Sequence, residues 1–220
     1  TRLRVILDFE KAPPIARLRT VAGKVEARPV PIPWNQAQVE DVLIERDGLR
    51  TYQRSSTELE FRDGTNLVLS EESLVFVRPS LPARPGPTKR SVEIVEGQAE
   101  VQALVPGAPR TDVEILVGSA TATARRSEDG LAQTRARKTD DGSAQVMVYE
   151  GESQVEAAGA SVDVPKGMGT AVPRDAPPSP PEQLLEAPAP REPAAGSEWR
   201  FGAPRCGREP TGGAGSHTPA

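Results

Sequence analysis

The chain has very few of the side chains on which most enzyme chemistry depends. Of its 220 residues, one is a cysteine, Cys206, and one is a histidine, His217. A single thiol cannot form an internal disulfide or a multi-thiolate metal site. A Ser-His-Asp triad needs a histidine in folded sequence, whereas His217 lies in a polar C-terminal stretch. We therefore expect no cofactor, no metal and no catalytic residue.

Long apolar runs and basic stripes are also missing. No segment reaches the roughly 18 apolar residues that span a bilayer, and no signal peptide is recognisable. Because the sequence starts at Thr1 without a methionine, we interpret it as a fragment. The formal net charge is −4, and without a basic stripe that releases counterions, nucleic acid is not an expected partner.

Aromatic residues make up only 4% of the sequence and hydrophobic residues 36%, whereas 23 residues are proline. Most prolines lie outside the strand-like segments, so we expect about two-thirds of the chain to fold. The expected organisation is an N-terminal strand or linker (1–15), a β domain (16–172, in halves at about 16–79 and 90–172 around a linker at 79–89), and a disordered Pro/Ala/Gly-rich spacer and tail (173–220).

Short segments with alternating apolar and polar residues fill the expected domain. Between Asp47 and Val77, Leu59 and Phe61 alternate with charged residues, a period typical of a strand with one buried face. The pairs Asp47-Gly48 and Asp63-Gly64 predict tight turns, because glycine adopts positive φ at no steric cost. The sequence thus predicts a β-meander here and an all-β fold.

A glycine pattern recurs three times, as VAGKVEAR at 21–28, VEGQAEVQ at 95–102 and YEGESQVEA at 149–157. In each, glycine separates an apolar segment from an alternating acidic one. A glycine at this place lets the backbone bend or bulge between two strands. We expect one recurring corner, in two or three similar β-units that share a core.

Candidates for chemistry or ligand binding are few. Adjacent acids such as Asp140-Asp141 do not face each other, as a glycosidase pair must, and they lack the loop spacing of a calcium site. Arg50 and Arg54 flank the central segment, either as a solvated face or as ligand contacts. Trp34 follows a proline-rich connector, where an aromatic residue is either a plug over the edge of the core or a ligand platform.

The order of these motifs resembles the FecR domain of bacterial envelope proteins, over about residues 16–172. The family pattern is a tryptophan, a Gly-Asp or Asp-Gly step that ends in Arg-Thr, a small residue, an alternating strand, Asp-Gly-Ser/Thr and a second alternating strand, with two glycine turns near the end. The residues that match it, as structural or interaction positions, are Trp34, Asp47, Gly48, Arg50, Thr51, Phe61, Asp63, Gly64, Gly151 and Gly167.

The resemblance implies short strands wound into a β-solenoid or sandwich-like roll, exported to the periplasm, with no catalytic residues. It implies a non-enzymatic cell-envelope domain for protein binding or signal transduction, whose partner is an envelope protein or a peptidoglycan-associated component. The expected surface is an open strand edge or the face of Arg50 and Arg54. The alternatives are the periplasmic sensor of an anti-sigma-type transmembrane regulator and a carbohydrate-active enzyme on a β-roll.

Overall fold

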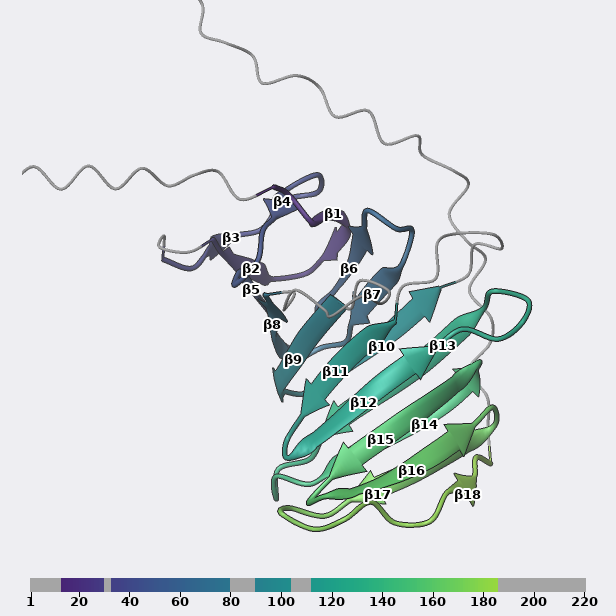
Figure 1. Ribbon diagram of the computed structural model, residues 1–220. Coiled ribbons are helices and arrows are strands. Elements are labelled where there is room, and N and C mark those ends of the chain that lie inside the picture. Colours follow the sequence, from purple (N-terminus) through teal and green to yellow (C-terminus); the bar gives the residue numbers. More distant parts are fainter. Residues whose placement is uncertain (1–12, 30–32, 80–89, 104–111, 186–220) are drawn as a thin grey trace, which may run out of the picture.

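The computed structural model describes residues 13–29, 33–79, 90–103 and 112–185 (Figure 1). Every regular element in these residues is a β-strand, which confirms the predicted all-β class. The strands form two nine-stranded sheets, and neither sheet closes on itself. None of these residues belongs to a helix that could cross a bilayer.

The sheets are called A and B here. In spatial order, sheet A contains β4 (Val42–Leu43), β1 (Ala16–Ala22), β6 (Ser56–Phe61), β7 (Asn66–Leu69), β10 (Gln98–Ala103), β13 (Ala132–Lys138), β14 (Ala144–Glu150), β17 (Met168–Val172) and β18 (Glu182–Gln183). Sheet B contains β3 (Asn35–Gln36), β2 (Val25–Arg28), β5 (Gly48–Thr51), β8 (Leu74–Arg78), β9 (Arg90–Glu96), β11 (Val113–Val117), β12 (Ala120–Arg125), β15 (Glu152–Ala157) and β16 (Ala160–Pro165).

One core lies between the two sheets. Alternate residues of most strands point inward, as in β6, where Thr57, Leu59 and Phe61 are buried. Buried side chains of both sheets, such as Leu18 of sheet A and Ile115 of sheet B, belong to a single apolar cluster. The alternation seen in the sequence is therefore the inner and outer face of a two-layer sandwich.

The chain crosses repeatedly between the sheets, so both grow from the N-terminal to the C-terminal end together (Figure 1). Neighbouring strands are antiparallel except β9 and β11. These two run parallel because β10, the strand between them in the chain, lies in the other sheet. A connection through the opposite layer is what parallel neighbours require.

The recurring glycine corner is confirmed. Gly23, Gly97 and Gly151 each lie where the chain passes from one sheet to the other, between β1 and β2, β9 and β10, and β14 and β15. Their φ angles are 73°, 75° and 78°, a conformation that other residues adopt only with strain. Each glycine thus ends a strand with a turn tight enough to enter the second layer.

The predicted β-meander over Asp47 to Val77 is wrong in its pairing. β6 and β7 do form a hairpin at Asp63-Gly64, with Gly64 at a φ of 76°. However, β5 and β8 lie in sheet B, where they pair with each other. Alternation shows which residues face the core, but not which sheet a strand joins.

The turn expected at Asp47-Gly48 is also wrong in its position. The residue with positive φ is Arg46 (75°), and Gly48 is already the first residue of β5. Asp47 is buried and closes this turn, because its Oδ2 accepts a hydrogen bond from the Ile44 amide at 2.8 Å. Glycine at position 48 serves another purpose, described below.

The C-terminal end of the domain differs from the expectation as well. The β domain is expected to end at residue 172, but β18 pairs with β17, with Gly169 opposite Glu182. Two residues of the expected spacer, Glu182–Gln183, therefore add a strand to sheet A. Residues 1–12 and 186–220, and all of the expected linker at 79–89 except Pro79, lie outside the described residues.

Candidate functional site

A cross-strand row on the outer face of sheet B brings together residues from four strands. Arg28 lies opposite Gly48, Gly48 opposite Phe76, and Phe76 opposite Glu93. Their sequence neighbours point into the core, so these residues point outward. The row is a product of register, because it joins positions that are far apart in the sequence.

Gly48 leaves room in this row for two aromatic rings. Trp34, which directly precedes β3, and Phe76 meet edge-on over it, with ring centroids 6.3 Å apart and planes at 61°. An added Cβ at position 48 would lie 2.7 Å from Cε1 of Phe76 and 2.9 Å from Cη2 of Trp34. The glycine is required here by the close approach of the rings and not by a turn.

Two arginines cover these rings. The Cζ atom of Arg28 lies 5.0 Å from the Phe76 ring centroid and 5.5 Å from that of Trp34, and Cζ of Arg50 lies 5.5 Å from the Trp34 centroid. These distances are typical of cation–π contacts. We call Arg28, Trp34, Arg50 and Phe76 the arginine–aromatic cluster.

The cations of this cluster are incompletely neutralised. The Nε of Arg28 is buried and has no hydrogen-bond partner, and neither Arg28 nor Arg50 forms an ion pair with a described residue. Glu26 lies opposite Arg50 in the register. Its pKa is lowered first by the Tyr52 hydroxyl, which donates to it at 2.7 Å, and then by Lys24 and Arg50.

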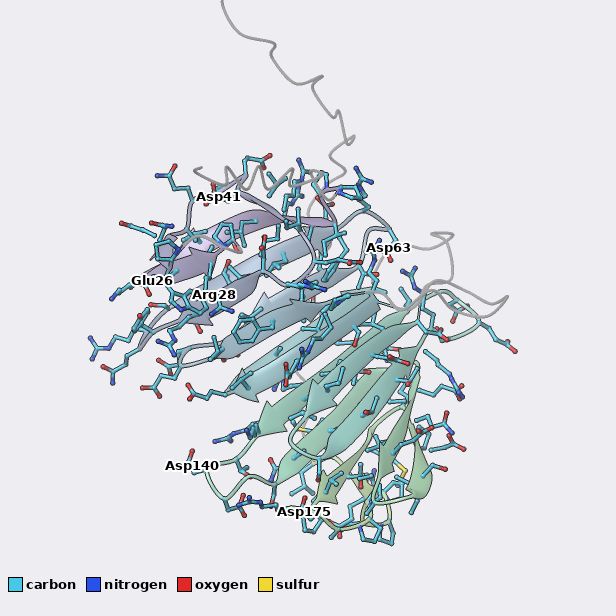
Figure 2. The ribbon with its side chains drawn as sticks, turned by 60° about the vertical axis from the view of Figure 1, so that its left-hand side comes forward. Glu26, Arg28, Asp41, Asp63, Asp140 and Asp175 are labelled. Carbon is cyan, nitrogen blue, oxygen red and sulfur yellow. The ribbon has the colours of Figure 1, made fainter. Side chains whose placement is uncertain are left out.

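A shallow pocket of about 570 Å³ adjoins the cluster. Nη2 of Arg78 and Oε2 of Glu93 form an ion pair of 2.5 Å at this pocket. Figure 2 shows Arg28 beside Glu26 near the N-terminal end of the sheets, away from Asp140 and Asp175. The pocket is lined by Arg28, Arg46, Phe76, Arg78, Pro79, Glu93 and Val95.

A second, polar groove lies around the corner between β9 and β10. One part has a volume of about 750 Å³ and a neighbouring part about 550 Å³, and both are lined by Lys138 and Asp140. Asp141 is committed to its turn, since it accepts hydrogen bonds from the Thr139 hydroxyl (2.6 Å) and the Ser143 amide (2.9 Å). In the described residues no three His, Cys, Asp or Glu side chains group as metal ligands.

The structure thus brings together three of the motif residues, Trp34, Gly48 and Arg50. Arg54 does not share their face, because it lies in the crossover between β5 and β6. Arg28 and Phe76 were not identified from the sequence. The alternation of β2 could have identified Arg28 as an outward-facing residue. Phe76 lies in the apolar run LVFV, where no alternation marks the outward-facing position.

The remaining motif residues make contacts within the fold. The Thr51 hydroxyl accepts a hydrogen bond from the Ser73 amide at 2.9 Å. Asp63 accepts a hydrogen bond from Nε of Arg90 at 3.0 Å, and Arg90 also covers the buried ring of Phe61, with 5.3 Å from Cζ to the centroid. Gly64, Gly151 and Gly167 lie in turns with positive φ.

The comparisons with known proteins point to one family. Residues 47–154, from the start of β5 into β15, match the family described as FecR protein. A comparison with curated protein sequences finds no match.

Two crystal structures of a protein described as an anti-sigma factor, from Parabacteroides distasonis ATCC 8503, show a distant likeness. The TM-scores are 0.46 and 0.44, at 13% and 15% sequence identity. In both cases the alignment covers 62% of this chain and 59% of the other, so the chain spans less than two-thirds of those proteins. The match, which includes strands of both sheets, shows a FecR domain over residues 47–154.

Proposed function

We propose that this chain is a non-enzymatic domain of the bacterial cell envelope that faces the periplasm and binds a protein or cell-wall partner in signalling. The FecR match over residues 47–154 supports a regulatory role of the sensor type. The observation that carries the proposal is the arginine–aromatic cluster on the outer face of sheet B.

The arginine–aromatic cluster contains the residue types that are typical of the centre of a protein–protein interface. Arginine and tryptophan are the side chains most often found to dominate binding energy at protein surfaces. Here they lie outside the core, so the sandwich does not need them to fill its interior. Neither Arg28 nor Arg50 has an ion pair with a described residue, so both guanidinium groups can still pair with an anionic ligand.

Open strand edges offer a second way to bind. Among the described strands, β3 and β16 form the edges of sheet B, and β4 and β18 form those of sheet A. An extended partner segment can add to such an edge through backbone hydrogen bonds alone. β16 is the longest of the four, with six residues, but it ends at Pro165, which cannot donate.

Site-specific photo-crosslinking in envelope preparations tests the proposal. A photoreactive residue at Gln36, on β3 near Trp34, is expected to crosslink to a second envelope component. The same residue at Ser161, exposed on β16 at the other end of sheet B, is the matched control. Crosslinks from Ser161 alone would move the binding surface to the β16 edge, and a chain that stays uncrosslinked at both positions would contradict the proposal.

Two alternatives are separated by other measurements. The sensor of an anti-sigma-type transmembrane regulator requires a membrane helix upstream of Thr1 in the full reading frame, and a wall-binding module there excludes it. A carbohydrate-active enzyme requires polysaccharide turnover by the purified protein that is abolished by a single Asp or Glu substitution.

A further inference from the structure

We propose that the pocket beside the arginine–aromatic cluster binds the carboxylate side chains of an acidic, extended peptide segment of a partner protein. This inference rests on the proposed function, because it names the chemistry of the partner that the same surface recognises. Its evidence is the charge of the pocket, the orientation of Arg28 and the mixed character of the walls.

The charge of the pocket is strongly asymmetric. Its lining contains three arginines, Arg28, Arg46 and Arg78, but a single acid, Glu93. Glu93 is engaged by Arg78 at 2.5 Å, whereas Arg28 and Arg46 have no ion pair with any described residue. A region with this excess of guanidinium groups attracts an anion to a protein whose formal net charge is −4.

Arg28 is held in place before any ligand arrives. Its guanidinium lies against the rings of both Trp34 and Phe76, and these contacts restrict its rotamers. A planar guanidinium binds a carboxylate through two parallel hydrogen bonds. Because the orientation is already set, less conformational entropy is lost when the carboxylate binds.

The residues that line the pocket favour binding of an acidic peptide over binding of a polyphosphate-like anion. Phe76, Pro79 and Val95 give the pocket an apolar side, and Glu93 repels closely spaced phosphates. An acidic peptide with apolar residues between its carboxylates matches both features, and its amides can donate to Glu93. A volume of about 570 Å³ lies in the range of sites that accommodate a few side chains.

The probe is a short peptide that alternates Glu and Val, compared with the same peptide containing Gln in place of Glu. Binding to the whole chain is followed by the fluorescence of Trp34 in a Trp199→Phe background, which leaves Trp34 as the one tryptophan. We expect the Glu peptide to bind at least about tenfold more tightly than the Gln peptide, and its affinity to fall with salt. Equal binding of the two peptides would overturn the proposal.

Three substitutions test whether the Glu peptide binds in this pocket. Arg28→Gln is expected to weaken binding of the Glu peptide about tenfold. Arg125→Gln is the matched control, because Arg125 lies on β12 in the same sheet, where it contacts Gln154 and Glu152. Glu93→Gln is expected to strengthen binding about threefold, a gain that misfolding cannot mimic. An equal loss in Arg125→Gln, or no gain in Glu93→Gln, would remove the pocket as the site.

A second titration uses peptides isolated from the cell wall, which also carry carboxylates. Weaker binding of these than of the Glu peptide supports a protein partner, and tighter binding contradicts it. The two proposals can be refuted separately. If acidic peptides do not bind but Gln36 still crosslinks to an envelope component, only the carboxylate inference is refuted. Absence of crosslinks at both Gln36 and Ser161 removes the proposed function itself.

Discussion

One carboxylate oxygen of Glu100 accepts hydrogen bonds from both Nε and Nη2 of Arg135, at 2.9 and 2.6 Å, on the outer side of sheet A. The other oxygen is bound by the side-chain amides of Gln133 (2.8 Å) and Gln102. Burial acts to raise the pKa of Glu100, but these donors outweigh burial and the pKa is lowered from its ordinary 4.5. A buried charge is therefore fully paired, as stability requires.

Glu100→Gln is expected to lower the free energy of unfolding at pH 7 by about 2 kcal/mol, because it leaves the Arg135 donors without a charged acceptor. Since the folded pKa lies below the unfolded one, the carboxylate stabilises the fold above about pH 4.5. This contribution disappears as the pH falls through the lowered pKa. Urea unfolding should therefore show a smaller difference from the wild type at pH 3. Glu58→Gln, on β6 of the same sheet, is the control, and an equal loss in it would refute the assignment.

Asp63 gives a second prediction, in which two of its contacts can be separated. Its Oδ2 pairs with Arg90, and its Oδ1 accepts the Thr65 amide at 3.0 Å. Burial acts to raise the pKa of Asp63, but Arg90 and Thr65 lower it further, below 3.8. Asp63→Asn should remove the ion pair and cost about 1 kcal/mol, and Asp63→Ala should cost about 1 kcal/mol more, because the Thr65 amide loses its acceptor.

Chemical denaturation of the two Asp63 variants at pH 7 measures this difference. The stabilisation from the ionised group is present above about pH 3.8 and is lost as the pH falls through the lowered pKa. Equal destabilisation by the two substitutions would show that the Thr65 hydrogen bond contributes nothing.

Alanine substitutions at two glycines with the same backbone conformation distinguish the cost of backbone strain from the cost of steric clash. Gly151 and Gly167 both have a φ of 78°. An added Cβ at Gly151 would lie 2.4 Å from the Arg125 carbonyl oxygen, whereas at Gly167 nothing lies within 4 Å. We expect Gly167→Ala to cost about 1 kcal/mol from backbone strain, and Gly151→Ala about 3 kcal/mol, since overpacking is added. Urea midpoints measure both, and equal costs would contradict tight packing at the corner.

Gly48→Ala should disturb the arginine–aromatic cluster without backbone strain, because φ at Gly48 is not positive. The added methyl group displaces Phe76 and Trp34, so we expect a shift in Trp34 emission in a Trp199→Phe background and a loss of about 1–3 kcal/mol. Adding Phe76→Leu should recover part of this loss, because the smaller side chain makes room. If the double variant loses as much stability as the two single variants lose together, positions 48 and 76 are not closely packed.

The local features of the fold could be predicted from the sequence. Leu59 and Phe61 revealed the inner face of β6, Asp63-Gly64 predicted its hairpin, and the recurrence of glycine predicted the corners at Gly97 and Gly151. Each depends on a few consecutive residues. The pairing of β5 with β8 depends on contacts across the whole sandwich, so the same local signals were compatible with a meander.

For the same reason, only some residues of the candidate site could be identified from the sequence. Trp34, Gly48 and Arg50 were found because they belong to a motif, but the reason for Gly48 was misread as a turn. Arg28 and Phe76 join them through the register of β2, β5 and β8. No spacing within the sequence marks that register.

The order of strands also determines how the domain responds to tension. β1 and β4 lie at one end of sheet A, and β17 and β18 at the other (Figure 1). Each strand is held mainly by its immediate neighbours, as in quasi-one-dimensional folds. A force that pulls the two ends apart therefore breaks backbone hydrogen bonds one after another and not all at once. We therefore expect the outer strands to detach first, at low force. Each detached strand re-forms its hydrogen bonds with its neighbour when the force is released.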